Sequence, residues 1–386
     1  MLYRNYTIAA LLTAAAIVYL SLYPFEWRTD FPPWGPLTQL ARTAHEWPQS
    51  HGDFLANVTL YLPWGFFAGL AFTRRMPSIV RIAIATLFGA LLSFAMELAQ
   101  FDVVGRFTDM RDIYANATGS LFGAIVAVMV GGDMRVGLPH GINLEPFPVF
   151  LLVGFLAVRL YPYVPVIDLH KYLQAIRPLL NVSSLPKAEL FIRTALWLLI
   201  AYLGEILSGK RAALLTFILI AGLVFAGRIA IADATLSAPD VLGAMIAFAL
   251  WFLLLRFLPG RVALLALFFA AALILERLDP FRLNPNPRGF DWIPFAGMMH
   301  GTIEGAILSF LSKFFFYGGL IWLLNEAGLR LWRATVAVVI LVFFCSVIER
   351  YIPGRSAEIT DTVMAILIGI TIKLMNPRRR GQPQPA

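Results

Sequence analysis

Cysteine and histidine are scarce in this chain of 386 residues, and their scarcity excludes several kinds of site. The single cysteine, Cys345, lies in an apolar run and cannot form an intrachain disulfide. The five histidines are dispersed through predicted loops and show none of the Cys/His spacings of a zinc site. We therefore expect no bound metal and no cofactor.

Charged residues are also few. Asp, Glu, Lys and Arg make up 14% of the residues, whereas 59% are hydrophobic and the mean hydropathy is +0.74. This composition excludes a soluble multidomain protein and predicts a multi-pass membrane protein. The formal net charge is +8. Because the basic residues flank apolar segments and do not form a stripe, we expect contacts with membrane lipids and none with nucleic acid.

Twelve apolar segments are long enough, or nearly so, for a tilted transmembrane span. They lie near residues 7–24, 54–72, 79–99, 112–130, 147–162, 190–207, 211–230, 240–258, 261–278, 308–325, 333–351 and 360–375. The predicted fold is therefore an all-α, polytopic transmembrane bundle of about twelve spans.

The charges of the connecting segments predict the orientation of these spans. Connections after even-numbered segments are mostly short and basic, for example at Lys210 and Arg211 and at Arg256 and Arg261, whereas those after odd-numbered segments carry most of the acids. Lys and Arg in short loops favour the cytoplasmic side. We therefore expect both termini in the cytoplasm and the loop after residue 99 outside.

Similar motifs recur in three parts of the chain. Apolar segments end at Tyr23-Pro24, Tyr161-Pro162 and Asp279-Pro280. From these prolines the distances are 33, 31 and 33 residues to Asn57, Arg193 and Lys313, and a further 55, 47 and 48 residues to Asp112, Asp240 and Asp361. A recurrence of this length predicts internal repeats.

The recurrence predicts three four-helix units that share one orientation in the membrane. They cover residues 1–130, 147–258 and 261–375, and a basic tail that we expect to be disordered follows at 376–386. The third unit keeps Glu349 and Arg355 as counterparts of Glu97 and Arg106. In the second unit Arg228 stands where Glu349 would stand, which reverses the charge.

Polar residues concentrate in the first unit, at the ends of apolar segments. The candidate ligand-binding residues are Asp53, Asn57, Glu97, Gln100, Arg106, Asp109, Asp112 and Asn116, and the repeat counterparts are Arg193, Asp240, Lys313, Glu349, Arg355 and Asp361. Polar groups at the ends of membrane helices are costly unless they are paired. We therefore expect those of the first unit to converge around one polar hollow at its outer mouth.

The order of these residues resembles the VanZ-like family of bacterial membrane proteins. The resemblance covers about residues 10–130 and rests on Asp53-x3-Asn57, Pro63-x-Gly65, Glu97-x2-Gln100, Arg106 and Asp112-x3-Asn116-x2-Gly119. It implies an envelope protein of the bacterial inner membrane. The founding member of the family is associated with resistance to the glycopeptide teicoplanin, and the resemblance implies no reaction and no transported substrate.

Two roles remain open for the polar residues of the first unit. In a structural role they pair with one another and cap helix ends. In a functional role Arg106 binds an anionic headgroup while Glu97, Asp109 or Asp112 positions it or transfers protons.

Three hypotheses for the function follow from the sequence. The first is a non-enzymatic envelope protein that binds a lipid, a polyprenyl-linked sugar or a glycopeptide-type amphiphile at the outer face. The second is a glycosyl- or phosphotransferase with a lipid-linked donor, and the third is a transporter of lipid-linked intermediates. The sequence favours the first, because it predicts no large outward domain, no histidine within the polar cluster and few polar residues near the middle of the spans.

Overall fold

The computed structural model describes residues 2–45, 51–72, 75–130, 146–180, 185–299 and 303–375. These residues divide into two compact units, one formed mainly by residues 2–130 and the other mainly by residues 146–299 and 308–373. The described secondary structure is helical apart from isolated β-bridges, so the predicted all-α class is confirmed. The predicted tail at 376–386 lies outside the described residues.

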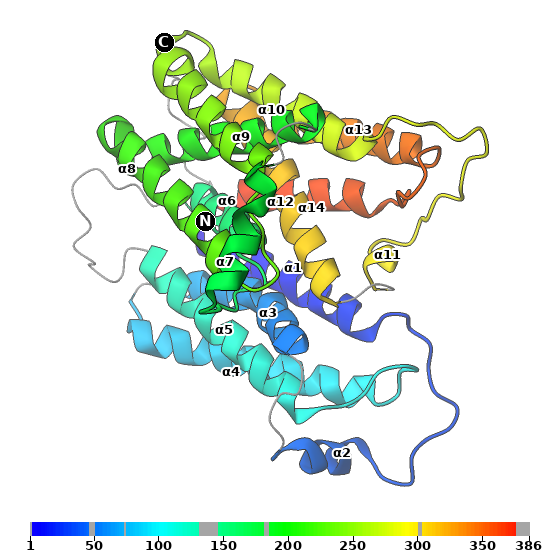
Figure 1. Ribbon diagram of the computed structural model, residues 1–386. Coiled ribbons are helices and arrows are strands. Elements are labelled where there is room, and N and C mark those ends of the chain that lie inside the picture. Colours follow the sequence, from blue (N-terminus) through cyan, green and yellow to red (C-terminus); the bar gives the residue numbers. More distant parts are fainter. Residues whose placement is uncertain are drawn as a thin grey trace. The chain divides into compact units, whose positions relative to one another are not determined.

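Five of the described helices lie within residues 2–130 of the first unit. These are α1 (Leu2–Leu22), α2 (Pro36–Thr43), α3 (His51–Ala71), α4 (Ser78–Gln100) and α5 (Met110–Val130). Helix α5 packs along α3 and also against α4, and α1 packs against α3 (Figure 1). Glycines permit the close approach of α3 and α5. A Cβ at Gly65, Gly119 or Gly123 would lie 2.0–2.2 Å from a backbone oxygen of the facing helix.

The remaining helices belong mostly to the second compact unit, which covers both the second and the third of the four-helix units predicted from the sequence. They are α6 (Pro146–Arg159), α7 (Leu169–Ile176), η1 (Arg177–Leu180), α8 (Lys187–Ala230), α9 (Ala238–Phe248), η2 (Ala249–Leu254), η3 (Leu255–Phe257), α10 (Arg261–Leu278), α11 (Ala296–Met299), α12 (Ile303–Glu326), α13 (Leu331–Glu349) and α14 (Thr360–Met375). Helix α8 packs against α6, α9 and α10. Aromatic rings fill this core, as in the pair Tyr202 and Trp322, whose ring centroids are 5.3 Å apart.

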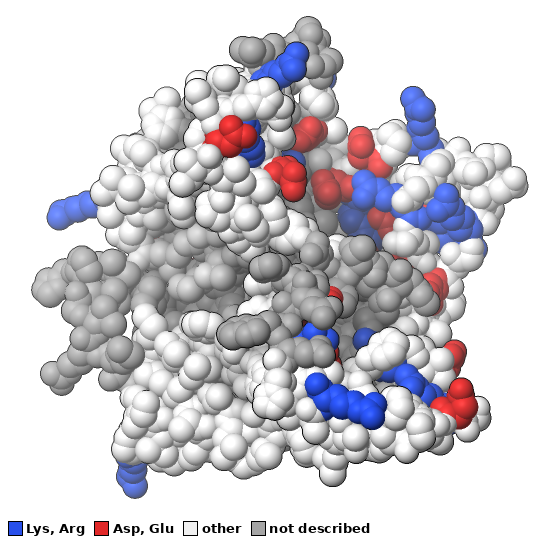
Figure 2. All heavy atoms as spheres, turned by 60° about the horizontal axis from the view of Figure 1, so that its bottom comes forward, with Lys and Arg blue, Asp and Glu red and all other residues white. Residues whose placement is uncertain are grey.

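Seven helices among the described residues are long and apolar enough to cross a membrane, and α1 and α6 contain shorter apolar segments. The predicted multi-pass membrane class is therefore confirmed by length and hydropathy. On the face shown in Figure 2, broad areas carry residues other than Lys, Arg, Asp and Glu.

The count of twelve spans expected from the sequence is not confirmed. The expected spans 190–207 and 211–230 lie in one 44-residue helix, α8, whose backbone departs from helical geometry at Gly209 (φ 77°, ψ 162°). Helix α10 carries three charged residues within its 18 positions, and α14 has only 16 residues. Both therefore have less uninterrupted apolar length than a hydrocarbon core of about 30 Å normally requires.

The three proline motifs adopt the same turn. The peptide bonds before Pro24, Pro162 and Pro280 are cis, and the residue after each proline has a positive φ of 57–64°. The backbone N–H of that residue donates a hydrogen bond of 2.7–2.9 Å to the carbonyl three residues earlier. The recurrence seen in the sequence therefore extends to the local backbone conformation.

Candidate functional site

The polar residues of the first unit meet where α3, α4 and α5 approach the loop between α4 and α5. Asn57 on α3 donates a hydrogen bond from Nδ2 to Oδ1 of Asp112 on α5, at 2.8 Å. Glu97 on α4 accepts one from the backbone N–H of Asp109, also at 2.8 Å. Glu97 also lies within electrostatic range of Asp112 and Arg106. We call Asn57, Glu97, Asp112 and Asn116 the acidic cluster.

The acidic cluster extends from a half-exposed rim into the core of the unit. Asn57 and Asp112 are half-buried, whereas Glu97 and Asn116 are only 3% and 4% exposed. Asn116 donates from Nδ2 to the hydroxyl of Ser93 at 2.8 Å. Its Oδ1 is buried and has no hydrogen-bond partner within the described chain. Buried polar atoms normally have a partner, so this oxygen is an unused acceptor at the inner end of the cluster.

Arg106 directs its hydrogen bonds to the end of α1. Its Nε donates to the carbonyl of Tyr23 at 3.1 Å, and its Nη2 donates to the carbonyl of Leu20 at 3.0 Å. The last carbonyls of a helix have no partner within the helix and favour a nearby cation. Burial lowers the pKa of Arg106, and the neighbouring Glu97 and Asp112 oppose this effect. Arg106 therefore attaches the α4–α5 loop to α1.

Three further candidates from the sequence lie at the ends of these helices or in the α4–α5 loop. Gln100 donates from Nε2 to the carbonyl of Ser21 at 3.0 Å. Asp109 accepts from the backbone N–H of Arg111 at 2.8 Å and forms an ion pair with the same residue. Asp53 lies at the start of α3 with an exposed side chain.

Arg28 belongs to the same loop attachment, although the sequence analysis did not single it out. Its Nε donates to the carbonyl of Val103 at 3.2 Å, and its Nη2 donates to the carbonyl of Arg106 at 2.6 Å. No sequence signal separates this arginine from others in loops, because its partners are backbone atoms 75 and 78 residues away.

The counterparts around Asp361 form a charge-rich cluster. Lys313 Nζ lies 2.7 Å from Asp361 Oδ1, and Arg277 pairs with both Asp361 and Glu349. Arg277 was not predicted from the sequence. The signal that could have identified it is its place three residues before Pro280, as Arg159 stands three residues before Pro162.

Arg355 makes the same kind of contact as Arg106. Its Nη2 donates to the carbonyls of Glu276 and Asp279, at 2.7 and 3.3 Å. These residues precede Pro280 by four and one, as Leu20 and Tyr23 precede Pro24.

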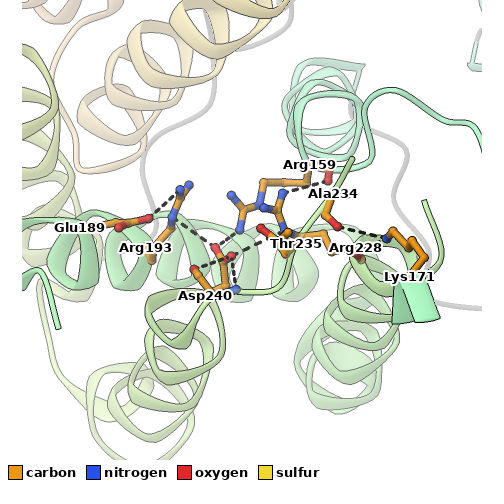
Figure 3. A network of polar contacts seen from close by, with 9 residues as sticks. Arg159, Lys171, Glu189, Arg193, Arg228, Ala234, Thr235 and Asp240 are labelled. Atoms are coloured by element: carbon orange, nitrogen blue, oxygen red, sulfur yellow. Dashed lines mark hydrogen bonds and ion pairs between the residues drawn. The ribbon is translucent and has the colours of Figure 1, made fainter. Parts of the chain in front are cut away.

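The counterparts Arg193 and Asp240 are also in contact. Arg193 Nε lies 3.2 Å from Asp240 Oδ1, and two arginines absent from the predicted list, Arg159 and Arg228, pair with the same carboxylate (Figure 3). No group of three or more His, Cys, Asp or Glu side chains within the described ranges is placed to hold a metal ion.

Comparison with known proteins supports the resemblance for the first unit. Residues 2–131 match the VanZ/LLP1 family. No curated protein and no solved structure matches the chain.

Proposed function

Because residues 2–131 form a VanZ/LLP1 family domain, we propose that this domain binds the polar head of a membrane amphiphile without catalysis. The ligand is a lipid, a polyprenyl-linked sugar or a glycopeptide-type amphiphile, and the acidic cluster is its site. The observation that carries the proposal is the half-open cluster itself, with the directly bonded pair Asn57 and Asp112 at its rim. The buried acceptor of Asn116 lies at its inner end.

The chemistry of the acidic cluster indicates which type of headgroup the ligand carries. Its carboxylates and the Oδ1 of Asn116 accept hydrogen bonds, and the nearby Arg106 and Arg111 direct their donors to α1 and to Asp109. Such a site complements hydroxyl, amide and ammonium groups. Sugars and glycopeptides are rich in these donors. An anionic headgroup bound by Arg106 has less support, because Glu97 and Asp112 lie beside its guanidinium and already offset its charge.

Asp112→Asn tests the proposed site. An asparagine Oδ1 can still accept the hydrogen bond from Asn57, so the fold should survive while the negative charge is lost. A hydrogen bond to a charged group is worth about 1.5–3 kcal/mol, so we expect roughly tenfold or greater weakening of ligand binding. The measurement is native mass spectrometry of the purified protein with a short-chain polyprenyl-linked N-acetylglucosamine and, separately, with teicoplanin.

Two further variants make this experiment decisive. Asp102→Asn removes the same charge from an exposed loop residue and should leave binding unchanged. Arg106→Ala removes the attachment to α1 and should lower the amount of folded protein. Wild-type binding of either probe by folded Asp112→Asn, or no binding by the wild type, would refute the proposed site.

We further infer that residues 147–258 and 261–375 are diverged copies of the first unit, each with four apolar helical segments. In this arrangement the two arms of α8 on either side of Gly209 are separate apolar segments. Three kinds of evidence support the inference. The proline turns share one conformation. In the first two units an antiparallel bridge begins three residues after the proline, at Trp27–Val103 and Pro165–Ile231. Arg106 and Arg355 donate to corresponding carbonyls.

The proposed orientation places both termini in the cytoplasm and the α4–α5 loop outside the bacterial inner membrane. It rests on the basic short loops. In a Cys345→Ser background, Asp102→Cys should react with an impermeant thiol reagent in intact cells. Leu329→Cys, in the short connection between α12 and α13, should react only after permeabilisation. The reverse labelling pattern would mean that the orientation is opposite to the proposed one. Labelling of both sites in intact cells would also contradict the proposed orientation.

A further inference from the structure

Three arginines of the second unit surround one buried aspartate. Asp240, near the start of α9, has a side chain that is 1% exposed and that pairs with Arg159 at the end of α6. Arg193 Nε and Arg228 Nε, both on α8, lie 3.2 and 3.6 Å from its carboxylate oxygens. Figure 3 shows the three guanidinium groups converging on this carboxylate. Ser237 also donates to Asp240 Oδ2 from its hydroxyl, at 2.9 Å.

The charges of this cluster do not balance. Glu189, 3.1 Å from Arg193 and 39% exposed, is the one further carboxylate within ion-pair distance of the three arginines among the described residues. Three guanidinium groups therefore share two carboxylates. The neighbouring Lys171 does not change this result, because its own electrostatic partner is Asp233. One positive charge remains without a carboxylate.

The arginine that forms the floor of the cluster also has an unused donor. The side chain of Arg159 is 6% exposed. Its Nε is buried and has no hydrogen-bond partner within the described part of the chain. A buried cation that lacks compensation is unfavourable, and a bound anion would supply both the missing charge and an acceptor.

The corresponding cluster around Asp361 is balanced. Its two cations, Arg277 and Lys313, face the two carboxylates of Glu349 and Asp361. The two clusters differ at two positions. Arg228 stands 12 residues before Asp240, where Glu349 stands 12 residues before Asp361, and Glu189 stands four residues before Arg193, where Ser309 stands four residues before Lys313. The positive excess of the second cluster is therefore a property of Arg228.

We propose that Arg159, Arg193 and Arg228 bind a phosphate group, carried either by an anionic lipid or by free phosphate. Guanidinium groups present paired N–H donors that match the oxygens of a phosphate. Arg193 and Arg228 are 26% and 19% exposed and give access from the surface, while Arg159 lies beneath them. The cluster lies at the ends of apolar helices, where the phosphates of lipid headgroups are found. The proposal does not depend on the function of the first unit and uses the proposed repeat only to choose a substitution.

Arg228→Glu is the main test, because it places an acid where the counterpart cluster has Glu349 and reverses the excess, so that two arginines face three carboxylates. The purified full-length protein is titrated with phosphatidylglycerol and with phosphatidylcholine and examined by native mass spectrometry. Its unfolding temperature is compared in sodium phosphate and sodium chloride of equal ionic strength. If the phosphate belongs to a lipid, we expect the wild type to bind phosphatidylglycerol at least tenfold more tightly than phosphatidylcholine. If free phosphate is the ligand, we expect the wild type to unfold at a higher temperature in sodium phosphate than in sodium chloride. Arg228→Glu should lose that preference.

A second variant keeps the test valid if Arg228→Glu does not fold. Arg193→Gln leaves two arginines facing two carboxylates and retains the pair Arg159 and Asp240. Arg282→Gln, at an exposed loop position, is the matched control and should behave as the wild type. The proposal is overturned if the wild type prefers neither probe, or if the folded variants keep its preference.

Discussion

Replacing Arg277 with methionine is expected to eliminate most of the folded protein. The Arg277 side chain is 8% exposed and forms ion pairs with Glu349 and Asp361. It also donates to the hydroxyls of Tyr317 and Ser346. Without it, Asp361 keeps its ion pair with Lys313, but the buried Glu349 loses its ion pair with Arg277. Removing one partner of a buried ion pair costs about 3–5 kcal/mol, which is a large part of a typical stability of about 5–15 kcal/mol.

The amount of monodisperse protein after solubilisation and its unfolding temperature measure this loss. Arg288→Met is the matched control, because Arg288 lies in an exposed loop, and it should leave both quantities unchanged. Arg277→Met combined with Glu349→Gln removes one charge of each sign and leaves the pair Lys313 and Asp361, so we expect partial recovery. Wild-type stability of Arg277→Met would show that the ion pairs do not stabilise the fold. A double variant no better than the single one would attribute the loss to packing of the arginine side chain.

Gly119→Ala is expected to separate α3 from α5 and to destabilise the first unit. Its Cβ would lie 2.2 Å from the carbonyl oxygen of Val58, a backbone atom that cannot rotate away. Overpacking a tight interface costs about 1–3 kcal/mol and occasionally more. A Cβ at Gly123 would lie 2.1 Å from the carbonyl oxygen of Leu62 in the same interface. We therefore expect the double variant to lose more folded protein than either single variant. Its destabilisation can be smaller than the sum of the two single effects, because one shift of α5 can relieve both contacts.

Gly222→Ala distinguishes this effect from a general intolerance of glycine substitution. Gly222 lies within α8, and a Cβ there meets nothing within 4 Å. An alanine in an open helical position stabilises a helix by roughly 0.5–1 kcal/mol relative to glycine. The unfolding temperature should therefore stay the same or rise for Gly222→Ala and fall for Gly119→Ala. Equal behaviour of the two variants would contradict the packing argument.

The sequence by itself determined the class of the protein and the position of most of its helices. The predicted span at 79–99 corresponds to α4 (Ser78–Gln100), and the one at 261–278 coincides with α10 (Arg261–Leu278). These features are local, because the hydrogen bonds of a helix are internal to the segment and its apolar length is written in consecutive residues. The contact between Asn57 and Asp112 was also foreseeable, because polar groups at helix ends are costly unless they are paired.

Only the tertiary structure decided which groups the arginines contact. Arg106 was a candidate for binding an anionic headgroup, yet its guanidinium donates to carbonyls of α1 that lie 83 and 86 residues away in the chain. Arg277 was not among the candidates, yet it joins Glu349 and Asp361 across 72 and 84 residues. An arginine side chain is long and can pair with any acceptor within reach. Its partner therefore depends on which helix ends meet in three dimensions, and the spacing of residues along the chain does not contain that information.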